Sequence, residues 1–304
     1  MTATLLVIKL GASGDVVRTT PLLRCLQGQV TWITAAVNIE LLNTITSTIR
    51  CISWEERDRA LDVRYDLIIN LEDTVDVARF SKTVNYDELF GAYLDSDGRI
   101  RYTDSASSWF DLSLISAYGR QEADRRKLLN RRTYQEMIFT GLGRHFSGDP
   151  YLLPPAIDTG LAGDVAIAVD AGPVWPMKKW AYYDKLKQQL EDGGLVVNIL
   201  PKRSSLLQHL ADVRNHSCLV SGDSLPMHLA LGTGRRCVSL FTCTSPWEIY
   251  DYGIQQKIVS GRLEEFFYKR DYNIRATTAI TIEEVERAVL HQIQLSKVVA
   301  EPVP

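Results

Sequence analysis

Four side chains of this 304-residue sequence lie where a strand is expected to pass into a helix, and their types could support chemistry: Asp15, Lys178, Ser224 and His228. A carboxylate such as that of Asp15 can take a proton from a hydroxyl group as a general base. Lysine, serine and histidine near a helix start can hold an anion such as a phosphate. The residue types therefore indicate proton abstraction in the first half of the chain and anion binding in the second.

Asp15 follows the first apolar segment of the chain. Leu5–Leu10 is apolar except for Lys9, as expected for a parallel strand covered on both faces. Gly11–Gly14 ends this strand in a glycine-rich turn, where left-handed backbone angles and the close approach of a ligand are expected. Asp15 then lies at the carboxyl end of the strand, where open α/β sheets bind ligands.

The start of the following helix has two interpretations. Thr20 and Pro21 suit the N-cap and first helical position, but Asp15 could also cap an earlier turn that Pro21 then kinks. In the simpler hypothesis for Asp15, its side chain only caps the helix.

Two turns of the second half carry the anion-binding residues. Ala171–Trp180 (AGPVWPMKKW) offers two lysines at a helix start, and Ser221–Ala230 (SGDSLPMHLA) offers Ser224 with His228 one turn further on. A structural interpretation remains open for each turn: Lys179 could simply lie on the surface, and His228 could be a hydrogen-bonded histidine of the core.

The remaining chain alternates strands and helices in two halves. We expect strands near residues 30–34, 51–54 and 65–71, then near 165–169, 195–200, 218–220 and 237–241. Residues 119–143 are expected to be helical, with basic residues that form either a solvated face or a site for an anionic acceptor. The prolines around Pro155 predict a boundary between domains 1–155 and 156–304. Thr281 and Glu284 predict a capping box for a last helix from Ile282, which could also pack back on the first domain.

Composition narrows the classes of partner. Neither half has an excess of basic residues, so no nucleic-acid partner is expected. The five cysteines form no CxxC pair, which favours a reducing compartment and no structural zinc. Because no apolar run reaches 18 residues and no signal peptide is evident, we expect a cytoplasmic protein with at most peripheral membrane contact.

Three stretches together resemble a known family. KLGASGDVVRTTPLLRCL, WPMKKW, and GDSLPMHLALGT followed by LFTCTSP are similar to the signature stretches of glycosyltransferase family 9, the heptosyltransferase family. The resemblance implies the GT-B fold of the α/β class, with two Rossmann-like doubly wound domains facing a central cleft. The first domain would bind the acceptor and the second the nucleotide-sugar donor.

The resemblance also implies roles for single residues. Asp15 matches the family's general base, and Lys178 matches the lysine that contacts the donor diphosphate. Donor-binding positions would be Lys178, Lys179, Asp223, Ser224, Leu225, His228 and Thr244. Acceptor-binding positions would be Gly14, Arg18, Glu72 and Asp73.

The sequence departs from the family pattern at three places. Leu225 replaces a glycine, Thr242–Thr244 replaces a glycine-containing turn, and Glu72 with Asp73 stands where the family often has Gln-Gly. A side chain at Leu225 restricts the backbone where the family keeps it free, which affects the expected phosphate geometry. The change at Glu72 affects the expected acceptor.

The reaction implied by this resemblance is an inverting, metal-independent sugar transfer in polysaccharide or lipopolysaccharide biosynthesis. The sugar would be heptose or a related one, the donor would be ADP-linked, and no further cofactor is expected. The acceptor would be a glycan, a lipid-linked molecule or a small molecule, and the enzyme would be cytoplasmic or peripheral to the inner membrane.

Three alternatives remain at this point. Gly222–Leu225 spells the GDSL of a serine hydrolase family, although no aspartate stands three residues before a histidine after Ser224. Asp95 and Asp97 could bind Mn²⁺ or Mg²⁺ in a metal-dependent glycosyltransferase, but Asp97 with Gly98 is better explained by a type I′ hairpin turn. A nucleotide-binding module without catalysis is the third alternative.

Overall fold

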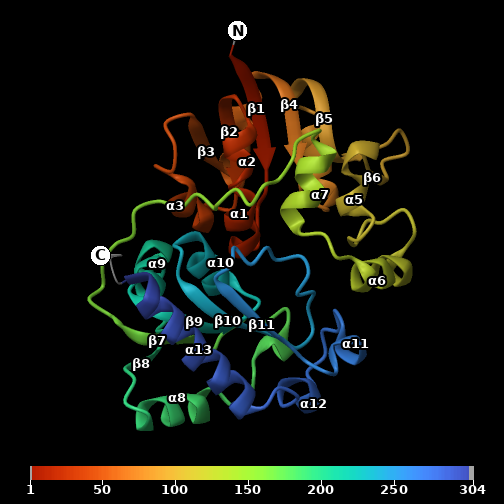
Figure 1. Cartoon of the computed structure of the whole chain (residues 1–304). Coiled ribbons are helices and arrows are strands. Elements are labelled where there is room, and N and C mark those ends of the chain that lie inside the picture. The colour runs from red at the N-terminus through yellow and green to blue at the C-terminus, as the bar shows by residue number, and fades with distance from the viewer. Residues whose placement is uncertain (1, 301–304) are drawn as a thin grey trace. The chain divides into compact units, whose positions relative to one another are not determined.

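The computed structural model describes residues 2–300, and the chain divides into two compact units, Met1–Pro155 and Ala156–Pro304. Each unit has a sheet with helices around it (Figure 1). Alternating strands and helices, as the sequence predicts, build both units.

The first unit contains a six-stranded sheet in the order β3-β2-β1-β4-β5-β6, of which β6 alone runs antiparallel to its neighbour. The strands are β1 (Ala3–Ile8), β2 (Gly28–Thr34), β3 (Ile49–Ser53), β4 (Arg64–Asn70), β5 (Asn85–Leu94) and β6 (Ile100–Tyr102). The α-helices are α1 (Ser13–Thr19), α2 (Leu22–Cys25), α3 (Ile39–Leu42), α4 (Val75–Ser81), α5 (Ser107–Phe110), α6 (Arg120–Leu129) and α7 (Tyr134–Gly141). Short 3₁₀ helices are η1 (Ala36–Asn38), η2 (Trp54–Ala60) and η3 (Asp104–Ala106).

Strand β1 lies at the centre of this sheet, between β2 and β4. Its apolar side chains Leu6 and Ile8 are fully buried, because helices cover both faces of a parallel sheet of this kind. The strand order reverses between β1 and β4, and such a switch point is where doubly wound sheets bind ligands. Asp15, in the first turn of α1, and Glu72, in the loop after β4, lie at this point.

The helix after β1 begins before Asp15. α1 starts at Ser13, so Asp15 is a residue of its first turn and not its cap, and Pro21 separates α1 from α2. The expected left-handed glycine turn is wrong, because neither Gly11 nor Gly14 has a positive φ and Gly14 lies inside the helix. Neither of the two helix starts considered is observed, because Ala12 is the N-cap residue of α1 and Pro21 that of α2.

Two further local predictions need correction. Residues 119–143 form two helices and not one, because Thr133 starts α7 with a capping box in which Glu136 takes part. The β5–β6 hairpin is present, but its turn is not type I′. Gly98 has a positive φ and Asp97 does not, and Asp95 accepts hydrogen bonds from the N–H groups of Asp97 and Arg99.

The second unit contains a five-stranded parallel sheet in the order β11-β10-β9-β7-β8. Its strands are β7 (Gly163–Ala168), β8 (Val197–Ile199), β9 (His216–Gly222), β10 (Arg236–Phe241) and β11 (Gln255–Val259). Its helices are η4 (Pro176–Lys178), α8 (Tyr183–Asp192), α9 (Leu206–Arg214), α10 (Leu225–Gly232), α11 (Leu263–Phe266), α12 (Ile274–Thr277) and α13 (Ile282–Ala300). The switch point of this sheet lies between β7 and β9, and the loops after them carry Lys178 and Asp223.

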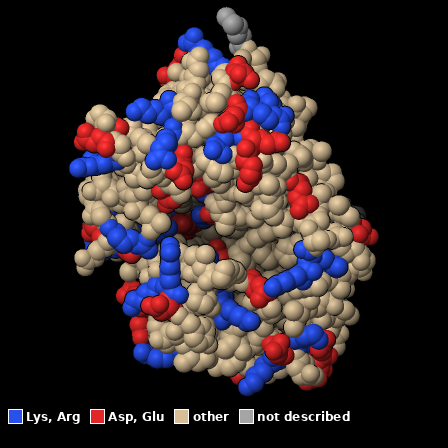
Figure 2. Space-filling model, turned by 180° about the vertical axis from the view of Figure 1, so that it is seen from behind, with Lys and Arg blue, Asp and Glu red and all other residues tan. Residues whose placement is uncertain are grey.

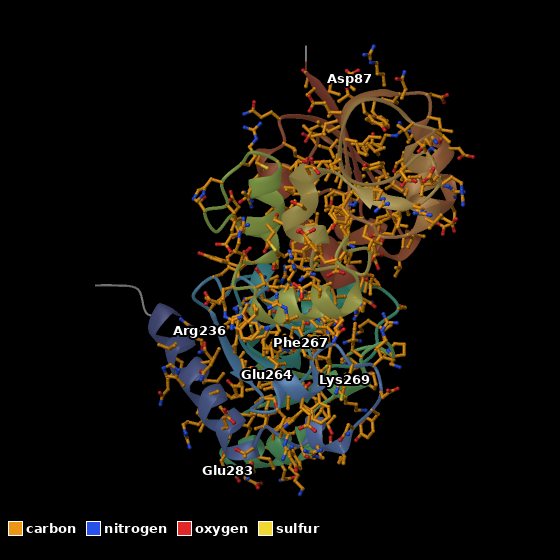
Figure 3. All side chains as sticks on the ribbon, turned by 90° about the vertical axis from the view of Figure 1, so that its right-hand side faces the viewer. Asp87, Arg236, Glu264, Phe267, Lys269 and Glu283 are labelled. Atoms are coloured by element: carbon orange, nitrogen blue, oxygen red, sulfur yellow. The ribbon has the colours of Figure 1, made fainter. Side chains whose placement is uncertain are left out.

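Helix α13 belongs to the core of the second unit. It starts at Ile282 as predicted, with the Glu284 N–H donating to Thr281 Oγ1 (3.3 Å). Val285 and Val289 are fully buried against the sheet along which α13 lies (Figure 1). Arg236 of β10, which is labelled in Figure 3, donates to Gln292 Oε1 (3.1 Å). The apolar face of this helix is therefore used by its own sheet. Packing of the helix on the first unit stays a prediction.

The surface carries charges of both signs. On the face drawn in Figure 2, Lys and Arg side chains are interspersed with Asp and Glu. The basic residues predicted in α6 follow this pattern, since Arg125 and Arg126 both pair with Glu122 (2.7 and 2.9 Å). No helix in residues 2–300 is long and apolar enough to cross a lipid bilayer.

Candidate functional site

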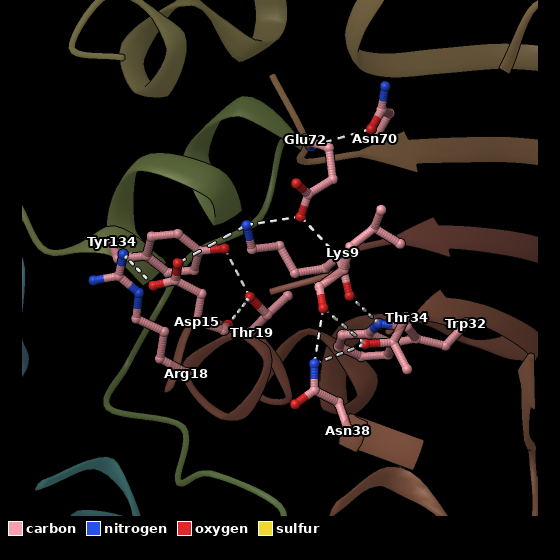
Figure 4. A network of polar contacts seen from close by, with 11 residues as sticks. Lys9, Asp15, Arg18, Thr19, Trp32, Thr34, Asn38, Asn70, Glu72 and Tyr134 are labelled. Carbon is pink, nitrogen blue, oxygen red and sulfur yellow. Dashed lines mark hydrogen bonds and ion pairs between the residues drawn. The ribbon is translucent and has the colours of Figure 1, made fainter. Parts of the chain in front are cut away.

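Asp15 is held by two cations of its own unit (Figure 4). Its Oδ1 lies 2.8 Å from Arg18 Nη2, and its Oδ2 lies 4.0 Å from Lys9 Nζ. The Asp15 side chain is 33% exposed, whereas those of Lys9 and Arg18 are only 9% and 11% exposed. The carboxylate can therefore be reached from solvent while the groups that orient it are buried.

Lys9 also pairs with Glu72, which comes from the end of β4. The distance from Lys9 Nζ to Glu72 Oε1 is 2.9 Å, and the same oxygen accepts the N–H of Leu10 (2.8 Å). Burial by itself lowers the pKa of Lys9, but the charges of Glu72 and Asp15 outweigh it and keep this pKa above its ordinary value. Lys9 is therefore a permanently charged group between two carboxylates.

Arg18 is fixed by aromatic packing as well as by Asp15. Its guanidinium carbon lies 4.1 Å from the ring centroid of Tyr134 and 5.9 Å from that of Trp109. Tyr134 is the first residue of α7 and shares a 2.7 Å hydrogen bond with Thr19. Burial raises the pKa of Tyr134, so its hydroxyl group stays protonated.

The predicted acceptor residues Gly14, Glu72 and Asp73 differ in how far solvent can reach them. Gly14 is buried in the first turn of α1, and Glu72 is buried with one carboxylate oxygen used by Lys9 and Leu10. Asp73 is half-buried at the start of the loop that leads to α4. Their contact with an acceptor stays a prediction.

In the second unit, Lys178 and Asp223 join the two loops of the switch point. Lys178 Nζ donates to the Asp223 carbonyl oxygen (2.6 Å) and lies 3.0 Å from Asp223 Oδ2. The two loops also touch through their backbones, because a Cβ atom on Gly222 would lie 2.7 Å from the Lys178 carbonyl oxygen. The close approach requires glycine at position 222 and places the ammonium group beside the start of α10.

Helix α10 begins directly after this pair. Ser224 is its N-cap residue, and Leu225 is its first helical residue. Leu225 replaces the family's glycine without strain, since its backbone is helical and has no positive φ. His228 is buried one turn further on, with 3% of its surface exposed. The N-terminal amides of α10 form the anion-binding end of a helix that Lys178 approaches.

Buried hydroxyl groups lie in the turn after β10. Thr242 donates to the Met177 carbonyl oxygen (2.6 Å), which ties this turn to η4. Within residues 2–300, the hydroxyls of Thr244 and Ser245 are buried without a protein hydrogen-bond partner. Buried hydroxyls normally have partners, so a bound ligand or water would satisfy them. Thr244 thus remains a candidate donor-binding residue.

Lys179 points to a different place from Lys178. It lines a pocket of about 430 Å³ at the ends of β7 and β8, together with Val169, Ile199 and Tyr272.

An aromatic contact joins the loop before η4 to the segment after α11. Trp175 packs edge-on against Tyr268 (centroid distance 5.3 Å), and the Tyr268 ring also contacts Phe267, which is labelled in Figure 3 (4.7 Å).

Of the two carboxylates considered as metal ligands, that of Asp95 is used by the hairpin turn. Asp95 Oδ2 accepts from Arg101 Nε (3.2 Å), and the backbone N–H of Arg99 chiefly lowers the Asp95 pKa. Among the described residues, no three His, Cys, Asp or Glu side chains are grouped so that they could hold a metal ion.

Three residues of the Asp15 cluster had no predicted role: Lys9, Tyr134 and Trp109. One signal for Lys9 was available, because a lysine inside an otherwise apolar strand needs a partner. The capping box at Thr133 could have placed Tyr134 at a helix start.

Part of the chain matches a known protein family. Residues 174–273, which include the Lys178–Asp223 pair and α10, match the sequence profile of glycosyltransferase family 9 (heptosyltransferase). The resemblance to family 9 is confirmed. The chain is a glycosyltransferase, which decides against the serine hydrolase suggested by Gly222–Leu225. None of the curated proteins matches it significantly.

Solved structures of glycosyltransferases share the fold over both units. The E. coli heptosyltransferase WaaC with ADP is 15% identical, with a TM-score of 0.62, and 95% of this chain and 99% of that chain are covered. The E. coli ADP-heptose LPS heptosyltransferase II is 16% identical (TM-score 0.63; 97% and 99% covered). The iron-containing dodecameric glycosyltransferase TibC of enterotoxigenic E. coli is 14% identical (TM-score 0.61; 99% and 81% covered). The chain therefore has the predicted GT-B fold with two Rossmann-like units.

Proposed function

We propose that this glycosyltransferase moves a heptose or related sugar from an ADP-linked donor to an acceptor hydroxyl with inversion at the anomeric carbon. The observation that carries the proposal is the Asp15 carboxylate, one-third exposed at the switch point of the first sheet and held by two nearly buried cations. A carboxylate fixed in this way is suited to accept a proton.

In the proposed step, the acceptor oxygen attacks the anomeric carbon while its proton passes to Asp15. The bond between that carbon and the diphosphate oxygen breaks, and the diphosphate leaves with the electron pair. Lys178 and the amides of α10 stabilise the negative charge that develops on the leaving group. The products are the glycosylated acceptor, the nucleoside diphosphate and one proton.

The donor is assigned to the second unit and the acceptor to the first. On the donor side we propose contacts from Lys178, Lys179, Asp223, Ser224, Leu225, His228 and Thr244, and on the acceptor side from Gly14, Arg18, Glu72 and Asp73. The orphan hydroxyls of Thr244 and Ser245 support the donor assignment, since they lie in the turn tied to η4. ADP is favoured as the nucleotide because the matched family stretch contains these residues and WaaC is solved with ADP.

The acceptor, the location and the metal requirement are proposed in the same way. The acceptor is a glycan, a lipid-linked molecule or a small molecule, and the reaction needs no metal ion. The five cysteines are all free, which fits a reducing compartment such as the cytoplasm, with at most peripheral contact with the inner membrane.

A thermal-unfolding panel with ADP, UDP, GDP and dTDP tests the donor assignment. A ligand at 100 times its Kd adds about 2.7 kcal/mol to the free energy of unfolding. We expect ADP to raise the unfolding temperature most and ADP-heptose to be consumed when an acceptor is supplied. A larger shift with another diphosphate would contradict the ADP assignment, and binding without any sugar transfer would favour the non-catalytic nucleotide module.

A further inference from the structure

Glu72 adds a second negative charge to the group of residues around Asp15 through its ion pair with Lys9 (2.9 Å). Three charged groups face the Asp15 carboxylate or its nearest cation: Lys9 from the end of β1, Arg18 from α1 and Glu72 from the end of β4. Tyr134 of α7, whose hydroxyl group stays protonated, packs against the Arg18 guanidinium. With Asp15 included, two positive charges and two negative charges balance.

Without Glu72, the two positive charges of Lys9 and Arg18 would face the single negative charge of Asp15. A carboxylate beside two cations binds protons weakly, and a weakly basic carboxylate is a poor general base. Glu72 offsets one of those cations, because its Oε1 lies 2.9 Å from Lys9 Nζ, closer than Asp15 Oδ2 at 4.0 Å. Figure 4 shows the Lys9 side chain extending between the two carboxylates.

The backbone fixes this arrangement on both sides. The N–H of Lys9 donates to the Ile33 carbonyl oxygen (3.1 Å), and its own carbonyl oxygen accepts from Trp32 Nε1 (3.4 Å). On the other side, the N–H of Glu72 donates to Asn70 Oδ1 (3.1 Å). A buried ion pair contributes little net stability compared with apolar side chains of similar size, so a role beyond stability is reasonable to seek here.

We propose that Lys9 and Glu72 act together as positioning residues for Asp15, with Lys9 directing its carboxylate and Glu72 offsetting the charge of Lys9 so that Asp15 remains basic. The inference rests on the proposed role of Asp15 as general base. It assigns Glu72 to the control of the base, in addition to the acceptor contact predicted for this position.

Titration of Asp15 itself tests this proposal without any substrate. Protein labelled with ¹³C at the aspartate carboxyl carbon is followed by NMR as a function of pH, and Asp15→Asn identifies the Asp15 signal. Glu72→Gln keeps the shape of the side chain but removes its charge, and we expect it to lower the Asp15 titration midpoint by about one pH unit or more. Lys9→Met should raise the midpoint by a similar amount.

The double variant Lys9→Met/Glu72→Gln removes both charges, and its midpoint should return close to that of the wild-type protein. It also protects the test against misfolding, because neither charge is then left buried without its partner. Glu56→Gln serves as the control, since it removes the partner of Arg59 at a site where both side chains are more than half exposed. Its Asp15 midpoint should not change.

Unchanged midpoints in both Glu72→Gln and Lys9→Met would overturn the proposal and show that the pair only ties β1 to β4. Shifted midpoints in the expected directions would support it. Turnover of Asp15→Asn is measured separately: full activity of that variant would refute the base and hence the proposed function, whatever the titrations show.

Discussion

Lys178 and Asp223 are joined across the switch point of the second sheet, with the lysine ammonium 2.6 Å from the aspartate carbonyl oxygen and 3.0 Å from its carboxylate. The contact orients the ammonium group before any ligand binds. A charge that is already oriented loses little conformational entropy on binding a diphosphate. The contribution of this contact can therefore be measured from the affinity for ADP, without an acceptor.

Lys178→Met should weaken ADP binding roughly 10- to 100-fold, since a hydrogen bond to a charged group contributes about 1.5–3 kcal/mol. Calorimetric titration with ADP measures the change. Lys187→Met is the matched control, because it also removes an ammonium group paired with a carboxylate, that of Glu191, in the same unit. Equal ADP affinity in Lys178→Met and the wild-type protein would refute the donor role of Lys178.

Gly222→Ala should disturb the same site through the backbone. Its new Cβ would meet the Lys178 carbonyl oxygen at 2.7 Å, so η4 must shift away from β9. Overpacking of this kind typically costs about 1–3 kcal/mol in the free energy of unfolding, and we expect ADP affinity to fall as well. Gly261→Ala is the control, because no atom lies within 4 Å of its built Cβ. Denaturant unfolding and calorimetry give both quantities, and normal values for Gly222→Ala would show that this close approach is unimportant.

Sugar transfer should persist in excess EDTA, because Lys178 and the start of α10 supply the positive potential for the leaving diphosphate. The variant Asp95→Ala/Asp97→Ala should retain most of its activity, since these residues shape a hairpin turn. Activity lost in EDTA and restored by Mn²⁺, Mg²⁺ or iron would contradict a metal-independent mechanism. The iron in the similar structure of TibC makes iron a necessary arm of this experiment.

Local patterns in the sequence predicted the alternation of strands and helices and the position of Asp15. A buried strand and an amphipathic helix each have a characteristic spacing of apolar residues, so both can be recognised from residues that are close in the sequence. They also predicted the start of α13 from Thr281 and Glu284, whose contact spans three residues.

Contacts between distant parts of the chain could not be predicted in this way. The Lys9–Glu72 pair joins residues 63 positions apart, and it depends on β1 lying beside β4. The contact between Thr19 and Tyr134 spans 115 positions and depends on the break before α7. The effect of Leu225 on the backbone could not be predicted either, because only the structure shows that the backbone at this position is helical.

The most direct test of the account is the turnover of Asp15→Asn with ADP-heptose and an acceptor that the wild-type enzyme uses, measured beside its affinity for ADP. Asp76→Asn is the matched control, since Asp76 also pairs with an arginine three residues on (Arg79, 2.7 Å) but lies on the exposed side of α4. We predict that Asp15→Asn lowers kcat by about 10²- to 10⁴-fold with unchanged ADP affinity, because only proton removal is lost. Wild-type turnover in Asp15→Asn would contradict the assignment of Asp15 as the general base.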